Sequence, residues 1–200
     1  MAIPPAAKVA AKSSTTNKKR SSPHDIENSK PTKKTKRDLV INAAPLQKLN
    51  VYVCGSGEGG ELGLGPKIKG GPKVTNIKYP RLNTLLDSRT VGVVQIAVGG
   101  MHCVALTHDQ QILTWGVNDL SALGRDTTWE APTRDIDDDD SDEEESDMNP
   151  LECTPTAIPA DSFGPNVSDV VQVIATNSAS FALTVDGFVY GWGAFSVSNS

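Results

Sequence analysis

Short runs of apolar residues, separated by Gly, Asp and His, recur along much of the chain. Such runs lie at residues 91–98, 103–107 and 112–115. Runs of this length that are bounded by turn residues are typical of β-strands rather than of helices. Asp186-Gly187 stands between two further runs and predicts a two-residue hairpin turn, because glycine adopts the positive φ that such turns require. The pattern therefore predicts an all-β fold.

The same pattern returns along the chain with an offset of 77 residues. Residues 94–97 (Val-Gln-Ile-Ala) return as residues 171–174 (Val-Gln-Val-Ile), and Trp115-Gly116 returns as Trp192-Gly193. An internal repeat with strand patterning indicates a repeat architecture in which each unit is one small sheet.

An earlier, partial copy places Cys54-Gly55 at the position of Trp115-Gly116, 61 residues before it. Both copies continue with Leu-Gly, as Leu62-Gly63 and as Leu123-Gly124, eight residues after Cys54 and Trp115. Small antiparallel sheets that each carry one such motif favour radial packing as the blades of a β-propeller. We expect an incomplete propeller of about two and a half blades.

The repeated positions are expected to have structural roles. The side chains of Trp115 and Trp192 should fill the space between neighbouring sheets, and the ring of His102 should form hydrogen bonds with neighbouring backbone. The repeat positions are Gly55, Leu62, Gly63, His102, Trp115, Gly116, Leu123, Gly124, Trp192 and Gly193.

Charge divides the chain into parts. The net charge of the 200 residues is −5, yet residues 1–50 carry eleven Lys or Arg against three acids, and residues 134–152 carry eleven acids against Arg134. Blocks of like charge with little apolar surface are expected to be disordered. We therefore expect a disordered basic tail at residues 1–46 and a partial propeller at 47–200, interrupted by a disordered acidic insert at 132–150.

Several classes of protein are excluded by composition. No apolar run approaches the ~18 residues of a membrane helix, so no membrane association is expected. Cys54, Cys103 and Cys153 are odd in number and far apart, and we expect three buried free thiols rather than disulfides or a zinc site. The histidines are too scattered to form a metal site, and no cofactor is expected.

Residues 55–60 satisfy the pattern G-x-G-x-x-G and raise the alternative of a phosphate-binding loop. A phosphate site of this kind needs a helix to begin there, whereas residues 61–66 (Glu-Leu-Gly-Leu-Gly-Pro) are a poor helix start. Glu58 and Glu61 would also repel an anion. We expect a turn at the edge of a blade.

Two basic clusters in the tail have the spacing of a bipartite nuclear-import signal, which predicts an import carrier as a partner. The clusters are separated by twelve residues and consist of Lys18, Lys19 and Arg20, and of Lys33, Lys34, Lys36 and Arg37.

The repeat resembles that of the regulator of chromosome condensation family. The second unit matches the family pattern at eleven positions. The third unit departs from the pattern at three positions: Thr176 replaces the usual Gly, Asn177 replaces a residue that is often Asp, and Ala179 replaces the usual His. The matching positions are Val94, Gly99, His102, Ala105, Leu106, Thr107, Asp109, Trp115, Gly116, Leu123 and Gly124.

This resemblance implies a guanine-nucleotide exchange factor for the small GTPase Ran, acting in nucleocytoplasmic transport and the cell cycle. It implies a nuclear protein bound to chromatin, whose basic tail contacts histones and the DNA backbone. An exchange factor catalyses no covalent step, because it works by binding the nucleotide-free GTPase more tightly than the loaded one. We expect this chain to be the N-terminal portion of such a protein.

In the family, the GTPase-facing surface includes an Asp in one blade loop and a wedge that follows a Trp-Gly-x-Phe strand end. The matching positions here are Asn177, which lacks the charge, and Ala194 and Phe195. The same propeller also serves as an interaction module without exchange activity, for example in ubiquitin ligases, and this remains the alternative function.

Overall fold

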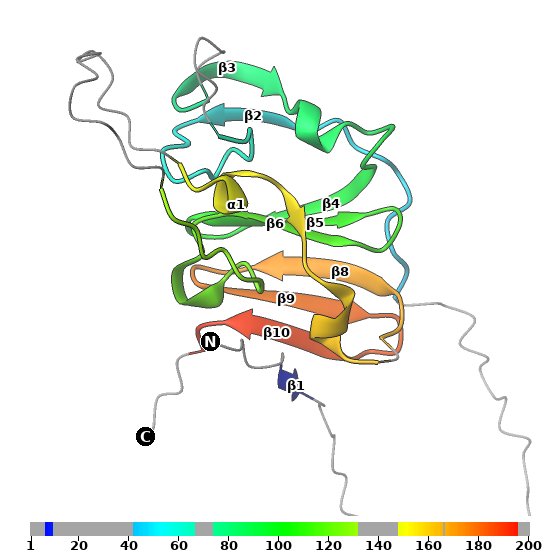
Figure 1. Ribbon diagram of the computed structural model, residues 1–200. Helices are drawn as coiled ribbons and strands as arrows, with labels where there is room; N and C mark the ends of the chain where they lie inside the picture. The colour runs from blue at the N-terminus through cyan, green and yellow to red at the C-terminus, as the bar shows by residue number, and fades with distance from the viewer. Residues whose placement is uncertain (1–6, 10–41, 67–73, 132–147, 166, 196–200) are drawn as a thin grey trace, which may run out of the picture.

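Three small antiparallel sheets form the framework of the computed structural model, which describes residues 7–9, 42–66, 74–131, 148–165 and 167–195. The sheets lie one above another in Figure 1, and we call them blades 1, 2 and 3 in chain order. Both basic clusters lie outside the described residues, as does most of the expected acidic insert.

Blade 1 contains two strands, β2 (Tyr52–Gly55) and β3 (Ile77–Leu82). The 3-10 helix η1 (Thr84–Leu86) follows, and the side chain of Asn83 caps it by accepting from the Leu85 N–H. The same fully buried amide donates to the carbonyls of Leu62 and Gly63 at 3.1 and 2.8 Å. Asn83 therefore joins the glycine-rich loop after β2 to the helix after β3.

Blade 2 contains four strands in the order β4-β5-β6-β7: β4 (Val93–Val98), β5 (His102–Thr107), β6 (Ile112–Gly116) and β7 (Thr156–Ala157). Two short helices, η2 (Asp119–Ser121) and α1 (Pro150–Cys153), lie between β6 and β7 in the chain.

Blade 3 follows the 3-10 helix η3 (Ala160–Phe163) and contains β8 (Val170–Ala175), β9 (Ala179–Thr184) and β10 (Val189–Gly193). Its fourth strand is β1 (Ala7–Val9), which pairs with β10 in antiparallel register. In the order of strands, β1 stands in blade 3 where β7 stands in blade 2.

The hairpin turns differ from the expected two-residue form. The backbone N–H of Thr107 donates to the carbonyl of Gln111, and that of Thr184 donates to the carbonyl of Phe188. These hydrogen bonds close loops of three residues, 108–110 and 185–187. Only the third residue of each loop has positive φ, +65° at Gln110 and +83° at Gly187. The Asp-Gly pair therefore occupies the last two positions of a wider turn, because the left-handed residue is needed only there.

Two apolar clusters fill the spaces between the blades, and both use the repeated positions. One joins blades 1 and 2, and its buried members are Val51, Leu86, Val93, Cys103, Ala105, Leu113 and Trp115. The other joins blades 2 and 3, and its buried members are Val94, Val104, Leu106, Ile112, Ile158, Val170, Val173, Ala182 and Trp192.

Trp115 and Trp192 each make a hydrogen bond to the preceding blade. The indole N–H of Trp115 donates to the carbonyl of Glu61, and that of Trp192 donates to the carbonyl of Ala122, both at 2.9 Å. A Cβ at Gly63 or Gly124 would lie 2.7 Å from the facing indole, so only glycine allows the ring to approach. The Leu-Gly pair recurs because its glycine lies against the indole ring of the next blade.

Gln95 joins blades 2 and 3 along β4 and β8. Its side-chain amide donates to the carbonyl of Val173 at 3.2 Å and accepts from the Val173 N–H at 3.0 Å. The side chain thus makes the pair of hydrogen bonds that a neighbouring strand would otherwise make.

All three cysteines are free, and Cys103 and Cys153 are buried. Burial, with Glu61 nearby, raises the pKa of Cys103 to about 12. The expectation of a buried thiol is wrong for Cys54, which is exposed. Cys54 stands at the Trp position of blade 1, and no sheet of the described residues covers that side of the blade.

Candidate partner-binding face

One side of the molecule carries the turns before β5 and β9 and the ends of β6 and β10. Strands β8 and β10 both end on this side, which is on the left in Figure 1. We call it the Asn177 face. The opposite side, the Asn50 face, carries the turns 108–110 and 185–187 and the segment that leads into blade 1.

Glycines at the strand ends shape the Asn177 face in the same way in blades 2 and 3. Gly116 and Gly193 have φ of +97° and +96°, and a Cβ at either would lie 2.4 Å from a backbone oxygen. The residue after each glycine then donates its N–H to the facing turn, Val117 to Met101 and Ala194 to Ser178, both at 2.9 Å. Gly55 in blade 1 has the same backbone form, with φ of +108°.

The turns of blades 2 and 3 are in direct contact on this face. A Cβ at Gly99 would lie 2.3 Å from the carbonyl oxygen of Thr176, and one at Gly100 would lie 2.5 Å from the side-chain oxygen of Asn177. The Gly100 N–H donates to the Thr176 carbonyl at 3.2 Å. Two small residues in blade 2 therefore allow the turn of blade 3 to lie against it.

The predicted GTPase-facing residues lie close together on this face. Asn177 is exposed, and its amide donates to the hydroxyl of Ser178 at 3.2 Å. Ala194 is joined to the same turn through the Ser178 carbonyl. The ring of Phe195 is half exposed and packs edge-on against Phe181, with ring centroids 5.6 Å apart.

Exposed apolar side chains at the neighbouring strand ends extend this surface. Val98 ends β4, Met101 lies in the turn before β5, and Ile174 lies near the end of β8. The sequence analysis did not select these residues. The sequence signal for these residues is an apolar residue next to a predicted turn, because no neighbouring strand covers a side chain at that position.

His102 lies buried beneath the Asn177 face and connects blade 2 to blade 3. Its Nε2 is 2.8 Å from the hydroxyl of Ser180, which in turn donates to the carbonyl of Ala122 at 3.1 Å. The expected backbone partner is therefore wrong, because the ring reaches a side chain of the next blade. Burial lowers the pKa of His102, so the neutral ring is favoured.

The glycine-rich loop has a different structure from a phosphate site. No helix begins within residues 55–66, and the N–H of Gly59 already donates to the carboxylate of Glu61 at 2.9 Å. A phosphate would have to displace that carboxylate. The described residues also contain no cluster of His, Cys, Asp and Glu that could hold a metal ion, and none of their helices is long and apolar enough to span a membrane.

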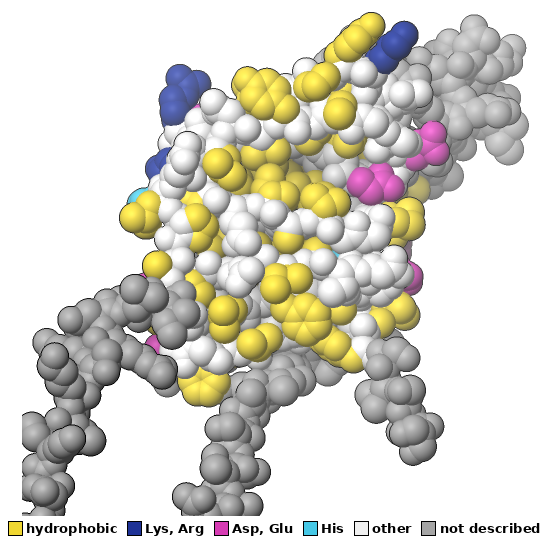
Figure 2. All heavy atoms as spheres, turned by 180° about the vertical axis from the view of Figure 1, so that it is seen from behind, with side chains coloured by type: hydrophobic (Ala, Val, Ile, Leu, Met, Phe, Trp, Pro, Cys, Tyr) yellow, Lys and Arg dark blue, Asp and Glu magenta, His cyan; other side chains and the backbone are white. Residues whose placement is uncertain are grey.

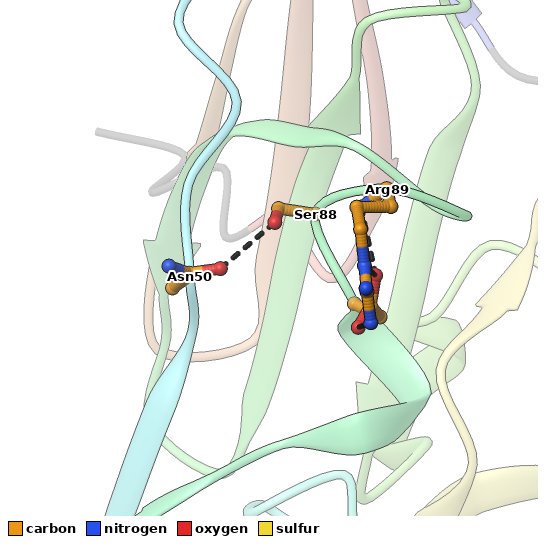
Figure 3. A network of polar contacts seen from close by, with 4 residues as sticks. Asn50, Ser88 and Arg89 are labelled. Carbon is orange, nitrogen blue, oxygen red and sulfur yellow. Dashed lines mark hydrogen bonds and ion pairs between the residues drawn. The ribbon is translucent and has the colours of Figure 1, made fainter.

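The Asn50 face is held by polar contacts between loops. Ser88 donates to the side chain of Asn50 at 2.8 Å, and Arg89 pairs with Asp87 beside them (Figure 3). The bond between Asn50 and Ser88 ties the segment before β2 to the loop before β4. Hydrogen bonds from Arg89 lower the pKa of Asp87.

A shallow cavity of about 330 Å³ lies where residues 42–45 cross the inner strands β4 and β8. It is lined by Asn42, Pro45, Gln95, Gln172 and neighbouring apolar residues. The segment that follows the basic tail thus enters the described structure beside these strands.

Figure 2 shows hydrophobic side chains gathered across the side of the molecule away from α1 and β7, with charged side chains along its margins. Few Lys or Arg side chains are visible on this side. The described blades therefore offer little positive charge there for binding nucleic acid phosphates.

Comparison with known proteins gives concordant results. A model of the regulator of chromosome condensation repeat matches residues 50–106. Guanine nucleotide exchange factor SRM1 of Saccharomyces cerevisiae is 41% identical over 174 residues, covering 81% of this chain and 35% of that protein. Protein pim1 of Schizosaccharomyces pombe is 39% identical over 82% of this chain and 28% of its own length.

Two solved structures confirm that these blades have the arrangement of a propeller of this repeat type. Prp20p from Saccharomyces cerevisiae, described with its binding to Gsp1p and histones, has a TM-score of 0.62 and 36% identity over 82% of this chain and 33% of its own. Yeast Prp20 bound to Kap60 has a TM-score of 0.63 and 34% identity over 91% of this chain and 37% of its own. The chain thus spans about a third of the length of the proteins that it resembles.

Proposed function

Because this chain belongs to the regulator of chromosome condensation repeat family, we propose that it is part of a nuclear guanine-nucleotide exchange factor for a Ran GTPase. SRM1, a relative named as a guanine nucleotide exchange factor, is similar to the chain over 81% of the chain's residues. The observation that carries the proposal here is the grouping of exposed Asn177, partly buried Ala194 and half-exposed Phe195 at one end of blade 3.

The chemistry of this face suits a protein partner. Its exposed apolar side chains include Phe195, Met101 and Val98, and Asn177 adds an uncharged hydrogen-bonding group. Exposed apolar groups of this kind mark surfaces that bind other proteins. Asn177 can donate to and accept from a partner's backbone, whereas the Asp usual in the family can only accept.

The mechanism needs no bond-making residue in this chain. A factor that binds the nucleotide-free GTPase more tightly than the loaded form must, by reciprocity, weaken the binding of nucleotide. The Asn177 face would act by stabilising the nucleotide-free conformation of its partner.

The basic tail would direct nuclear import and bind chromatin. We propose that Lys18, Lys19, Arg20 and the cluster from Lys33 to Arg37 bind an import carrier and, once in the nucleus, DNA phosphates and histones. Support comes from the bipartite spacing and from the related Prp20 protein, which has been described bound to Kap60 and for its binding to histones. Residue 42, where the described chain resumes, lies by β4 and β8 near the cavity and not among the residues of the Asn177 face.

Release of a fluorescent guanine nucleotide from loaded Ran tests the proposal. The chain should accelerate release in proportion to its concentration, and Asn177→Ala and Phe195→Ala should each reduce the acceleration. Asp186→Ala, which changes an exposed turn residue outside the Asn177 face, is the matched control and should act like the unaltered chain. If all three variants accelerate nucleotide release as much as the unaltered chain does, the GTPase contacts a surface other than the Asn177 face.

The alternative function, an interaction module without exchange activity, predicts a different result. The chain would then leave nucleotide release at its spontaneous rate at every concentration. The Asn177 face would remain a protein-binding surface, with a partner other than a GTPase.

A further inference from the structure

The loop that follows β6 holds two consecutive residues in a backbone conformation that suits glycine. Leu120 has φ of +52° and ψ of +31°, and Ser121 has φ of +63°. In this left-handed region the backbone crowds a Cβ, and a bulky residue such as leucine is rarely found there. The loop therefore keeps Leu120 in a conformation that is unfavourable for it.

The internal repeat shows which residue type satisfies this backbone. The offset of 61 residues between blades 1 and 2 aligns Leu120 with Gly59 and Ser121 with Gly60. Gly60 has φ of +84°, so this left-handed position is shared by both blades. Blade 1 meets the requirement with glycine, whereas blade 2 places side chains at the same point of the loop.

The side chain of Leu120 gives the fold no burial in return for the strain. It is 60% exposed, whereas Leu123, three residues later, is fully buried. Blade 2 packs against a blade on each side, so the exposure of Leu120 does not come from a missing neighbour. Unfavourable backbone conformations of this kind cluster at binding and active sites.

Hydrogen bonds within the loop fix the position of Leu120. The side chain of Asn118 accepts from the N–H of Leu123 at 3.0 Å. It also donates to the carbonyl of Arg125 at 3.1 Å and to the hydroxyl of Thr127 at 2.9 Å. The tip of the loop is exposed, so Leu120 is presented to solvent on a backbone that these bonds hold in place.

The two ends of the loop place Leu120 on the Asn177 face. At one end, the Val117 N–H donates to the carbonyl of Met101 in the turn before β5. At the other end, the carbonyl of Ala122 accepts from the indole N–H of Trp192, near the end of β10. Leu120 lies three residues after Val117 and two before Ala122, and is therefore beside the junction of blades 2 and 3.

We propose that Leu120 is a contact residue for the GTPase, positioned by the strained loop to pack against an apolar side chain of that partner. This role presupposes the proposed function and adds to the Asn177 face a residue from a different loop. A partner that covers Met101 and the end of β10 also meets the loop anchored to both. Because the backbone of Leu120 is already fixed, little conformational freedom is lost when its side chain is buried on binding.

Two substitutions at position 120 separate the contact from the fold. Leu120→Asn removes the apolar side chain, and asparagine tolerates the left-handed conformation better than leucine does. Leu120→Met keeps an apolar side chain of similar volume. Val185→Asn, at an exposed apolar position on the Asn50 face, is the matched control.

Titration of nucleotide-free Ran with the full chain and these variants gives the test, with thermal unfolding of the same samples. Leu120→Asn should weaken binding by about tenfold, the effect of leaving a leucine side chain unburied. Its midpoint of thermal unfolding should stay unchanged or rise by up to about 4 °C, because the strain is relieved. Leu120→Met should bind within about threefold of the unaltered chain, and Val185→Asn should bind equally well.

Two results would overturn the proposal and leave the proposed function standing. A Leu120→Asn variant that binds Ran as tightly as the unaltered chain would show that the side chain makes no contact. A variant that binds weakly and also unfolds at a lower temperature would show that Leu120 serves the fold. If the unaltered chain does not bind nucleotide-free Ran at all, the proposed function fails and the contact fails with it.

Discussion

At the scale of residues, the steric reason that glycine is required differs between the recurring glycine positions. Gly116 has both a positive φ and a backbone oxygen where its Cβ would be, whereas Gly187 has a positive φ with no atom within 4 Å of that point. The pair therefore separates the cost of the backbone conformation from the cost of the contact.

Replacing these two glycines by alanine should give different losses of stability. Gly187→Ala should lower the free energy of unfolding by about 1 kcal/mol, the cost of a left-handed residue. Gly116→Ala should lower it by at least about 3 kcal/mol, because the Met101 carbonyl must also move. Urea unfolding of both variants measures the difference, and equal losses would show that the contact has no effect.

The buried indoles should contribute more than any exposed aromatic ring. Trp115→Ala removes a side chain that is 2% exposed, and the cavity and lost hydrogen bond should cost about 3–5 kcal/mol. Tyr52→Ala, at an exposed position, should change the free energy of unfolding by no more than about 0.5 kcal/mol. A small loss at Trp115 would contradict its role in joining blades 1 and 2.

His102 should make stability depend on pH. Its pKa is lowered on folding from the ordinary value of 6.5, so the unfolded chain binds more protons. The contribution of the neutral ring is complete above pH 6.5 and is lost as the pH falls below it toward the folded pKa.

Unfolding measured between pH 7.5 and 5 should show this loss, with a slope of at most about 1.4 kcal/mol per pH unit. His102→Gln should flatten the profile in this range, because its amide has no proton to gain. His108→Gln, at an exposed position, should keep the slope. An unchanged slope in His102→Gln would assign the dependence to another group.

At the scale of elements, the sequence was sufficient to predict the strands of blades 2 and 3 and the position of Trp115 and Trp192 between neighbouring sheets, because the strand pattern and the repeat indicate the same elements. It did not predict that β1 would pair with β10, since a three-residue segment among Ala and Pro residues has no strand pattern. Cys54 was misjudged because its exposure depends on what covers blade 1. His102 was given the wrong partner because Ser180 is 78 residues away.

The side-chain amide of Gln95 links strands β4 and β8, and the sequence pattern alone did not predict this link. Gln95→Ala leaves the backbone groups of Val173 without their partner, and should cost about 1–3 kcal/mol and speed hydrogen exchange of the Val173 amide. Gln172→Ala, at the matching position of blade 3, changes an exposed side chain and is the control. Equal exchange rates at Val173 in both variants would mean that Gln95 is dispensable.

At the scale of the molecule, the blades bring together residues that belong to different units. The Asn177 face combines the turn before β9 with the end of β10 and with exposed apolar residues of blade 2. The family resemblance indicated Asn177, Ala194 and Phe195 by position, and only the three-dimensional arrangement adds Val98, Met101 and Ile174. A partner that contacts this face would thus bind two blades at once.

The ratio of two affinities tests the proposed function most directly. Binding of the full chain to nucleotide-free Ran and to GDP-loaded Ran can be measured by titration under otherwise identical conditions. We expect at least about tenfold tighter binding of the nucleotide-free form, which corresponds to a coupling of about 1.4 kcal/mol. Equal affinities for the two forms, or tighter binding of the loaded form, would contradict the proposed role in nucleotide exchange.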